Sequence, residues 1–205
     1  MKKAIMAALA LGLSGCATTY TAPDFEEYRA SHETVAILPF DVAINASTQG
    51  KNAPSQEELD AIEAQQAEIF QRALYVQFLE KQERGRYTVD IQDIDETNVR
   101  LSRLEQSGAA MTKAETAKLI GVDAVVSGKM SLSKPMGTGW AVATTLLLGF
   151  GATNSGIVHM TVHEGEGGKL MWSYEHELSG GVMSSPESVA KALMGGIANK
   201  FPYRK

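Results

Sequence analysis

The chain is poor in cysteine, in long apolar runs and in positive charge. Its 205 residues include one cysteine, Cys16, so no intramolecular disulfide can form and the fold depends on packing. No uninterrupted apolar run reaches the ~20 residues that a membrane-spanning helix needs. Lysine and arginine number 19 against 24 aspartates and glutamates, which gives a net charge of −5. This balance argues against a nucleic-acid partner, whose phosphates need a basic face, and against electrostatic adhesion to anionic lipid.

The N-terminus has the organisation of a secretory leader. Lys2 and Lys3 precede an apolar stretch over residues 4–13, and small residues lead to Cys16. The ending Leu13, Ser14, Gly15, Cys16 resembles the bacterial lipobox. The resemblance implies that residues 1–15 are removed and that Cys16 becomes an acylated first residue, which anchors the protein to a membrane without spanning it. The residue after the cysteine is Ala17, whereas an aspartate at this position retains many such proteins at the inner membrane. We therefore expect the protein to be located at the periplasmic face of the outer membrane.

Residues 16–33 are small and polar with little periodicity, and we expect them to form a tether. A single domain over residues 34–203 should follow, because this length suits one core. The run Thr34–Phe40 is continuously apolar, as in a central strand covered on both faces, and we expect further strands at residues 87–91 and 122–132.

Two capping boxes predict helices between these strands. Ser55 with Glu58 should open a helix to about Gln82, and Thr112 with Glu115 should open one that stops at Gly121. Asp95 is expected to cap a short helix between them. Two strand-helix-strand units in series predict a partly parallel sheet.

Residues 156–164 and 170–178 alternate as two strands of a hairpin. A three-residue loop at residues 166–168 pairs Val162 with Trp172 and Met160 with Tyr174. A two-residue loop would set Met160 against Glu175 and turn an apolar face toward water, so the first register is expected. A closing helix from Pro186 completes the predicted fold class: an α/β sandwich of two or three layers with a mixed sheet.

No cluster of residues indicates a cofactor or metal site. His159 and His163 share a strand face, where they lie ~13 Å apart along the strand and cannot share an ion. Glycine pairs at residues 137–139 and 149–151 lack the full nucleotide-loop pattern. The acidic group Asp90, Asp93, Asp95 and Glu96 is typical of a solvated strand end or helix cap, with a catalytic carboxylate pair as the alternative.

One segment within an apolar insertion at residues 135–155 is unusual. Residues 139–151 carry no charge, show no helical stripe and have glycine at both ends. The segment is either a buried element that covers the sheet or a contact surface for another copy, a partner or lipid. Its candidate contact residues are Trp140, Leu146, Leu147, Leu148 and Phe150.

Two stretches of the sequence carry a family resemblance. They are residues 35–40 (Val-Ala-Ile-Leu-Pro-Phe) and residues 121–128 (Gly-Val-Asp-Ala-Val-Val-Ser-Gly). Both resemble bacterial lipoproteins built on the domain of the curli secretion lipoprotein CsgG, a domain that is itself like the N-terminal domain of TolB. The ending Phe201-Pro202-Tyr203 resembles a group of small lipoproteins within this family. The resemblance implies an α/β fold and a role as a secretion-channel subunit, an envelope-assembly accessory or an activator of cell-wall synthases, none of which needs a catalytic residue. Two amphipathic hairpins found in the channel-forming relatives are missing.

We therefore expect a non-enzymatic, membrane-anchored lipoprotein of the cell envelope that acts as a scaffold, an assembly or secretion accessory, or a partner-binding module. Its partners would be the membrane, through Cys16, and a second protein or further copies of itself. Two alternatives stay open: an envelope polysaccharide- or peptide-processing enzyme that uses the carboxylates near Asp93, and a carrier of a small apolar ligand. An enzyme needs those carboxylates to converge in a cleft, and a carrier needs an enclosed apolar cavity.

Overall fold

The structure is a computed structural model, and it describes residues 17–45, 55–105, 110–133, 155–179 and 186–205. The strands are β1 (Ala17–Thr21), β2 (Thr34–Ile37), β3 (Asp41–Asn45), β4 (Asp90–Ile91), β5 (Ala124–Ser133), β6 (Ser155–Glu164) and β7 (Leu170–Ser179). The helices are α1 (Phe25–Ser31), α2 (Gln56–Glu83), α3 (Ile94–Glu105), α4 (Lys113–Ile120) and α6 (Pro186–Lys200). The predicted α/β class is confirmed.

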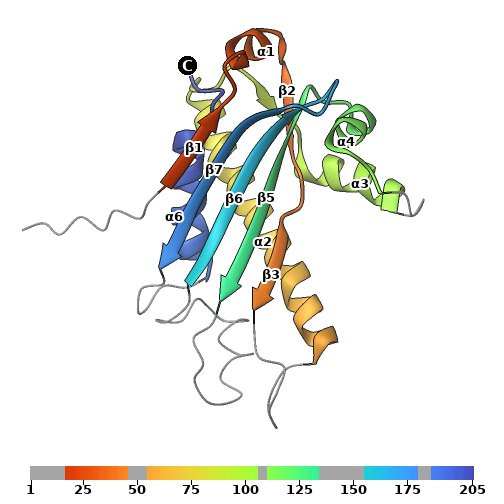
Figure 1. Cartoon of the computed structure of the whole chain (residues 1–205), viewed down its shortest axis with the longest axis vertical. Coiled ribbons are helices and arrows are strands. Elements are labelled where there is room, and N and C mark those ends of the chain that lie inside the picture. The colour runs from red at the N-terminus through yellow and green to blue at the C-terminus, as the bar shows by residue number, and fades with distance from the viewer. Residues whose placement is uncertain (1–16, 46–54, 106–109, 134–154, 180–185) are drawn as a thin grey trace, which may run out of the picture.

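The seven strands form one mixed sheet in the order β1-β7-β6-β5-β2-β4, with β3 paired to β5 below β2 (Figure 1). β2 lies parallel to both β4 and β5, and β3 is also parallel to β5. The β5-β6-β7-β1 part is antiparallel. The run that begins at Thr34 therefore forms a strand paired on both sides, next to the two-residue edge strand β4 rather than in the middle of the sheet.

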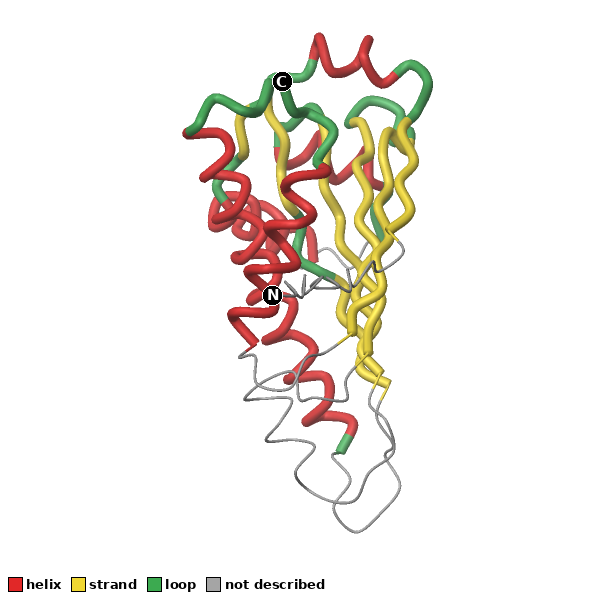
Figure 2. The backbone as a smooth tube through the Cα atoms, turned by 90° about the vertical axis from the view of Figure 1, so that its left-hand side faces the viewer, coloured by secondary structure: helices red, strands yellow, loops and turns green. Residues whose placement is uncertain are grey.

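Helices cover the two faces of the sheet unequally. The long helices α2 and α6 pack on one face, which is the layered arrangement visible from the side in Figure 2. The larger core lies between them and the sheet, and it contains Ile37, Phe70, Leu74, Phe78 and Trp172. A smaller core on the other face joins Ala36, Leu38 and Val125 to Ala117 and Ile120 of α4. The sandwich thus has three layers where α3 and α4 pack on β2, β5 and β6, and two layers over β7 and β1.

The predicted strand Thr34–Phe40 is interrupted. Ile37 pairs with Val126 and Asp41 pairs with Lys129, so four steps on one strand match three on β5. The extra residue falls beside Pro39, which has no backbone N–H to donate. It shifts the alternation so that Phe40, Val42 and Ile44 face the larger core, as Val35 and Ile37 do before the break.

Both predicted capping boxes are present. The Ser55 hydroxyl accepts from the backbone N–H of Glu58, and Thr112 accepts from that of Glu115 in the same way. α4 ends at Gly121, whose φ of 74° lies in the left-handed region that favours glycine. Local sequence therefore sets these helix ends.

The hairpin register is also confirmed. Val162 pairs with Trp172, Met160 with Tyr174, and His159 with Glu175. Beyond Val162 a register shift places Leu170 opposite His163, which turns Met171 as well as Trp172 into the core.

The expectation of a tether over residues 16–33 is wrong for the described part, residues 17–33. β1 pairs antiparallel with β7 over its whole length, and the backbone N–H of Ala22 donates to Met171 O at 2.8 Å. α1 then inserts Phe25 into the core, 3% exposed. Small threonine-rich sequences favour extended backbone, and the free edge of β7 supplies the hydrogen-bond partners that sequence inspection could not see.

Candidate functional site

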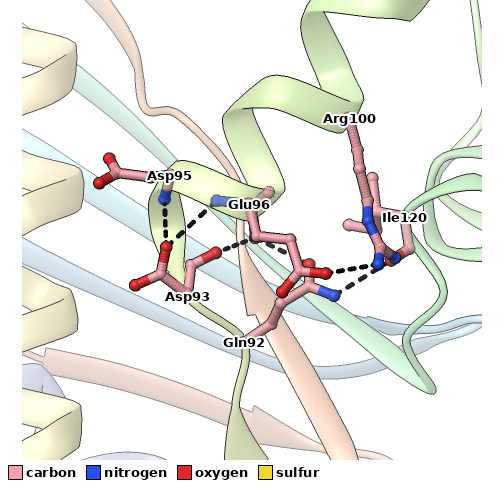
Figure 3. Close-up of polar contacts among 7 residues, drawn as sticks. Gln92, Asp93, Asp95, Glu96, Arg100 and Ile120 are labelled. Atoms are coloured by element: carbon pink, nitrogen blue, oxygen red, sulfur yellow. Dashed lines mark hydrogen bonds and ion pairs between the residues drawn. The ribbon is translucent and has the colours of Figure 1, made fainter.

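The carboxylates after β4 are used to start a helix. The Asp93 side chain accepts hydrogen bonds through Oδ1 from the backbone N–H of Asp95 at 2.9 Å and of Glu96 at 3.1 Å (Figure 3). Its Oδ2 accepts from the Tyr75 hydroxyl at 3.1 Å. These backbone bonds, above all the one from Glu96, lower the pKa of Asp93. Asp93 rather than the predicted Asp95 is therefore the N-cap residue of α3.

The neighbouring acidic side chains point in different directions. Asp95 extends away from Asp93, and Glu96 forms an ion pair with Arg100, whose guanidinium also donates to the carbonyl of Ile120 (Figure 3). Asp90 accepts from Gln82 at 3.0 Å. The carboxylates do not converge on a reacting position, so the catalytic alternative near Asp93 is not supported. They tie α3 to α2 and to the end of α4.

The two histidines of β6 lie where the strand prediction places them, on the face away from the larger core. His159 lies across from Glu175, and His163 is half-buried beside Lys113 of α4. Burial, and then the charge of Lys113, lowers the pKa of His163. Among the described residues no group of three His, Cys, Asp or Glu side chains is placed to hold a metal ion.

Glu164 is a buried acid that the sequence did not single out. Its carboxylate accepts from the backbone N–H groups of Glu166, Gly167 and Lys169 at 2.7, 2.7 and 3.1 Å. Burial alone would raise the pKa of Glu164, but these hydrogen bonds outweigh it and the pKa is lowered. Glu164 therefore closes the β6-β7 turn, a role that the Gly-Glu-Gly-Gly turn sequence could have suggested.

The C-terminus packs into the larger core. Phe201 is 1% exposed and Tyr203 is fully buried. The Tyr203 hydroxyl lies 2.5 Å from Nδ1 of His32, at the far end of the sequence. Burial lowers the pKa of His32. The negative charges of Asp123 and Glu164 act to raise it, but burial has the larger effect.

We expect the free energy of unfolding to fall as the pH drops from about 7.5 to about 5.5, because unfolded His32 has an ordinary pKa near 6.5 and then binds protons that the native state excludes. The pKa of His163 is also lowered, so His163 contributes to the same fall in the free energy of unfolding. Urea unfolding of the parent and of His32→Gln across this range checks the prediction. The variant should show a shallower dependence on pH, and equal slopes in the two proteins would contradict the assignment to His32.

The helical face carries an open surface groove rather than an enclosed cavity. A groove of ≈ 460 Å³ runs over Ile69, Ala73 and Val76 of α2, with Arg72 and Lys191 at its rim. An apolar ligand carrier needs an enclosed site that removes most of its ligand from water. Within the described residues, this groove does not supply one.

The lipobox residues and the apolar contact residues lie outside the described residues, but the strands beside them are described. Ala17, the residue after Cys16, is already in β1 opposite His176. The segment that contains Trp140–Phe150 leaves the sheet after Ser133 and returns at Ser155, which pair with each other at the end of the β5-β6 ladder. None of the helices in the described ranges is long and apolar enough to cross a membrane.

The sequence matches no protein-family model and no curated protein. Three solved structures are similar in fold. The PelC dodecamer from Paraburkholderia phytofirmans is 14% identical, covers 94% of this chain and 100% of its own, and has a TM-score of 0.46. The lipoprotein GNA1162 from Neisseria meningitidis is 14% identical over 82% of this chain and 96% of its own, with a TM-score of 0.42. The C-terminal domain of LpoB from Salmonella enterica is 11% identical over 73% of this chain and 84% of its own, with a TM-score of 0.35.

These values describe a likeness of fold and carry no function over to this chain. Membership in the CsgG-like family stays a resemblance of the two strand motifs. The function has to be argued from the residues and from their placement.

Proposed function

We propose that this chain is a lipid-anchored, non-enzymatic accessory protein of the bacterial cell envelope, held at the periplasmic face of the outer membrane by acylated Cys16. It serves there as a scaffold or partner-binding module. The observation that supports this most directly is that Ala17, the residue after the lipobox cysteine, belongs to β1. Cleavage before Cys16 would leave the described strand in the mature protein, so the predicted leader does not overlap the described sheet.

The polar clusters support the non-enzymatic part of the proposal. Asp93, Glu164 and Asp123 are the described acids with the most backbone partners, and each one organises a turn or a strand end. Asp123, for example, accepts from the backbone N–H groups of Glu33 and Thr34, both at 2.8 Å. The lowered pKa values of Asp93 and Glu164 mean that these two carboxyl groups are ionised and make poor proton donors at neutral pH.

Replacement of Cys16 by alanine should release the protein from the membrane fraction, because the acyl anchor is lost. Membrane fractionation and intact-mass measurement of the parent and of Cys16→Ala check this. The parent should carry lipid mass on Cys16. An unlipidated parent, together with a variant that stays as membrane-bound as the parent, would overturn the proposed anchoring.

A further inference from the structure

The outer side of α2, which faces away from the sheet, has an apolar middle (Figure 2). Val76 is 46% exposed and Leu79 is 37% exposed, although the helix already packs Leu74 and Phe78 into the larger core on its inner side. The outer side of a surface helix is normally polar. Two large aliphatic side chains one turn apart on this side therefore indicate a contact that the single chain does not make.

Two hollows lie in series along this side of α2 and meet at Val76. The first is the groove described above, which lies toward the N-terminus of the helix, over Ile69 and Ala73. The second is a hollow of ≈ 620 Å³ that lies toward the C-terminus of the helix, beside Leu79. Each hollow is bordered by apolar side chains and can receive the side chains of a second molecule.

The two hollows differ in charge. Charged residues border both of them: Arg72, Lys191 and Glu68 border the first, and Glu80, Glu83 and Asp90 border the second. The side chains of Arg72 and Glu83 form no ion pair or hydrogen bond with the rest of the described chain. The surface therefore has a free cation on one side of its apolar middle and a free anion on the other.

The spacing of these residues makes the surface complementary to itself. Positions 69, 72, 76, 79 and 83 of α2 follow one another at the alternating intervals of a coiled-coil seam, and we call them the α2 seam. When two such seams run antiparallel, Val76 of one copy lies opposite Leu79 of the other. Arg72 then lies opposite Glu83, and a two-fold axis makes each of these contacts twice.

We propose that the α2 seam binds the α2 seam of a second copy of this chain, antiparallel, across a two-fold axis between Val76 and Leu79. The apolar middles of the two helices cover each other, and the Arg72 guanidinium of each copy pairs with the Glu83 carboxylate of the other. A parallel arrangement sets Arg72 against Arg72 and Glu83 against Glu83, so repulsion between like charges disfavours it. A second copy supplies both complementary charges at the required spacing by symmetry alone.

The size of the α2 seam sets the strength of the association. It spans residues 69–83, about 22 Å of helix. A contact of this length is smaller than the interface of a permanent dimer, so monomers and dimers should coexist and the balance should depend on protein concentration. The inference gives the proposed accessory role a partner, but it does not depend on the acylation of Cys16.

The test measures the oligomeric state of the chain over residues 16–205 with Cys16→Ser, so that neither an acyl group nor a disulfide between copies contributes. We expect sedimentation equilibrium to show dimers that dissociate on dilution. Val76→Ser should raise the dissociation constant of the dimer about tenfold or more, because each dimer buries this side chain twice. Val99→Ser is the matched control and should have no effect, since Val99 is also an exposed helical valine, at 52%, but lies in α3.

Charge reversals test the antiparallel register. Arg72→Glu and Glu83→Arg should each weaken dimerisation about tenfold or more, because each sets like charges opposite each other at both contacts. An equimolar mixture of the two variants should dimerise again, since every contact between unlike variants then joins opposite charges. The double variant should dimerise by itself for the same reason. Arg103→Glu makes the same charge change on α3 and should dimerise as the parent does.

The outcomes separate this inference from the proposed function. A parent that stays monomeric at every soluble concentration overturns the dimer and leaves the surface to a different protein, and the accessory role and the acyl anchor stand. Dimers that survive Val76→Ser, or that the mixture of charge variants does not restore, also overturn the proposed contact. Circular dichroism and thermal melting show whether each variant folds. If Val76→Ser unfolds the chain, the mixture of charge variants still decides.

Discussion

Truncation of Ile37 to alanine is expected to lower the free energy of unfolding by about 2–5 kcal/mol. Ile37 is fully buried in β2, pairs with Val126 of β5 and faces the larger core. β5 pairs with β2 at Ile37, and the side-chain amide of Gln71 donates to the Ile37 carbonyl, so the backbone is held and cannot collapse into the space that the lost methyl groups leave. Two-state urea unfolding of the parent and variant measures the difference.

Ile157→Ala is the matched control for this truncation. Ile157 is the same residue type, also in a strand, but it is 43% exposed on the face opposite α2 and α6. Truncation of Ile157 should lower the free energy of unfolding by no more than about 0.5 kcal/mol. Equal effects at the two positions would show that β2 is not the centre of the core.

Substitution of Gly128 by alanine is the second change with a large expected effect. A Cβ atom at this position would lie 2.4 Å from Cε1 and 2.5 Å from Cδ1 of Phe40. Phe40 is 4% exposed and packs against Phe70, so its ring has little room to withdraw. We expect the free energy of unfolding to fall by about 1–3 kcal/mol, which is the usual effect of overpacking a core.

A double-mutant cycle tests the physical reason. Phe40→Leu alone should destabilise the protein, but in that background Gly128→Ala should cost much less, because the ring that meets the new methyl group is gone. Gly196→Ala is a glycine control, since an added Cβ there meets nothing within 4 Å. Additive effects at Gly128 and Phe40 would contradict the steric explanation.

The close approach of Phe40 to Gly128 illustrates what the sequence could not show. The sequence places Phe40 in an apolar run and Gly128 in a valine-rich strand. It does not show that an extra residue beside Pro39 carries the aromatic ring over the glycine. The same holds for Tyr203, whose hydroxyl meets His32 only because α1 and the C-terminus fold to the same end of the sheet.

The candidate functional residues also divide into those that the sequence alone predicts and those whose arrangement only the structure shows. Cys16 and the apolar residues 140–150 are predicted from local lipobox and composition signals alone, and they lie outside the described residues. The sequence left open whether the carboxylates near Asp93 converge, and their divergence depends on how α3 leaves β4.

The sequence by itself determined the α/β class, both capping boxes, the stop at Gly121 and the hairpin register. Each of these follows from residues within about a turn or a hairpin of one another, where backbone hydrogen bonding and alternation leave few choices. The tertiary structure alone decided that residues 17–31 join the fold and that Asp93 caps α3. Those results depend on which strand edge is free and on the order of strands in the sheet, and both are set by contacts between residues far apart in the chain.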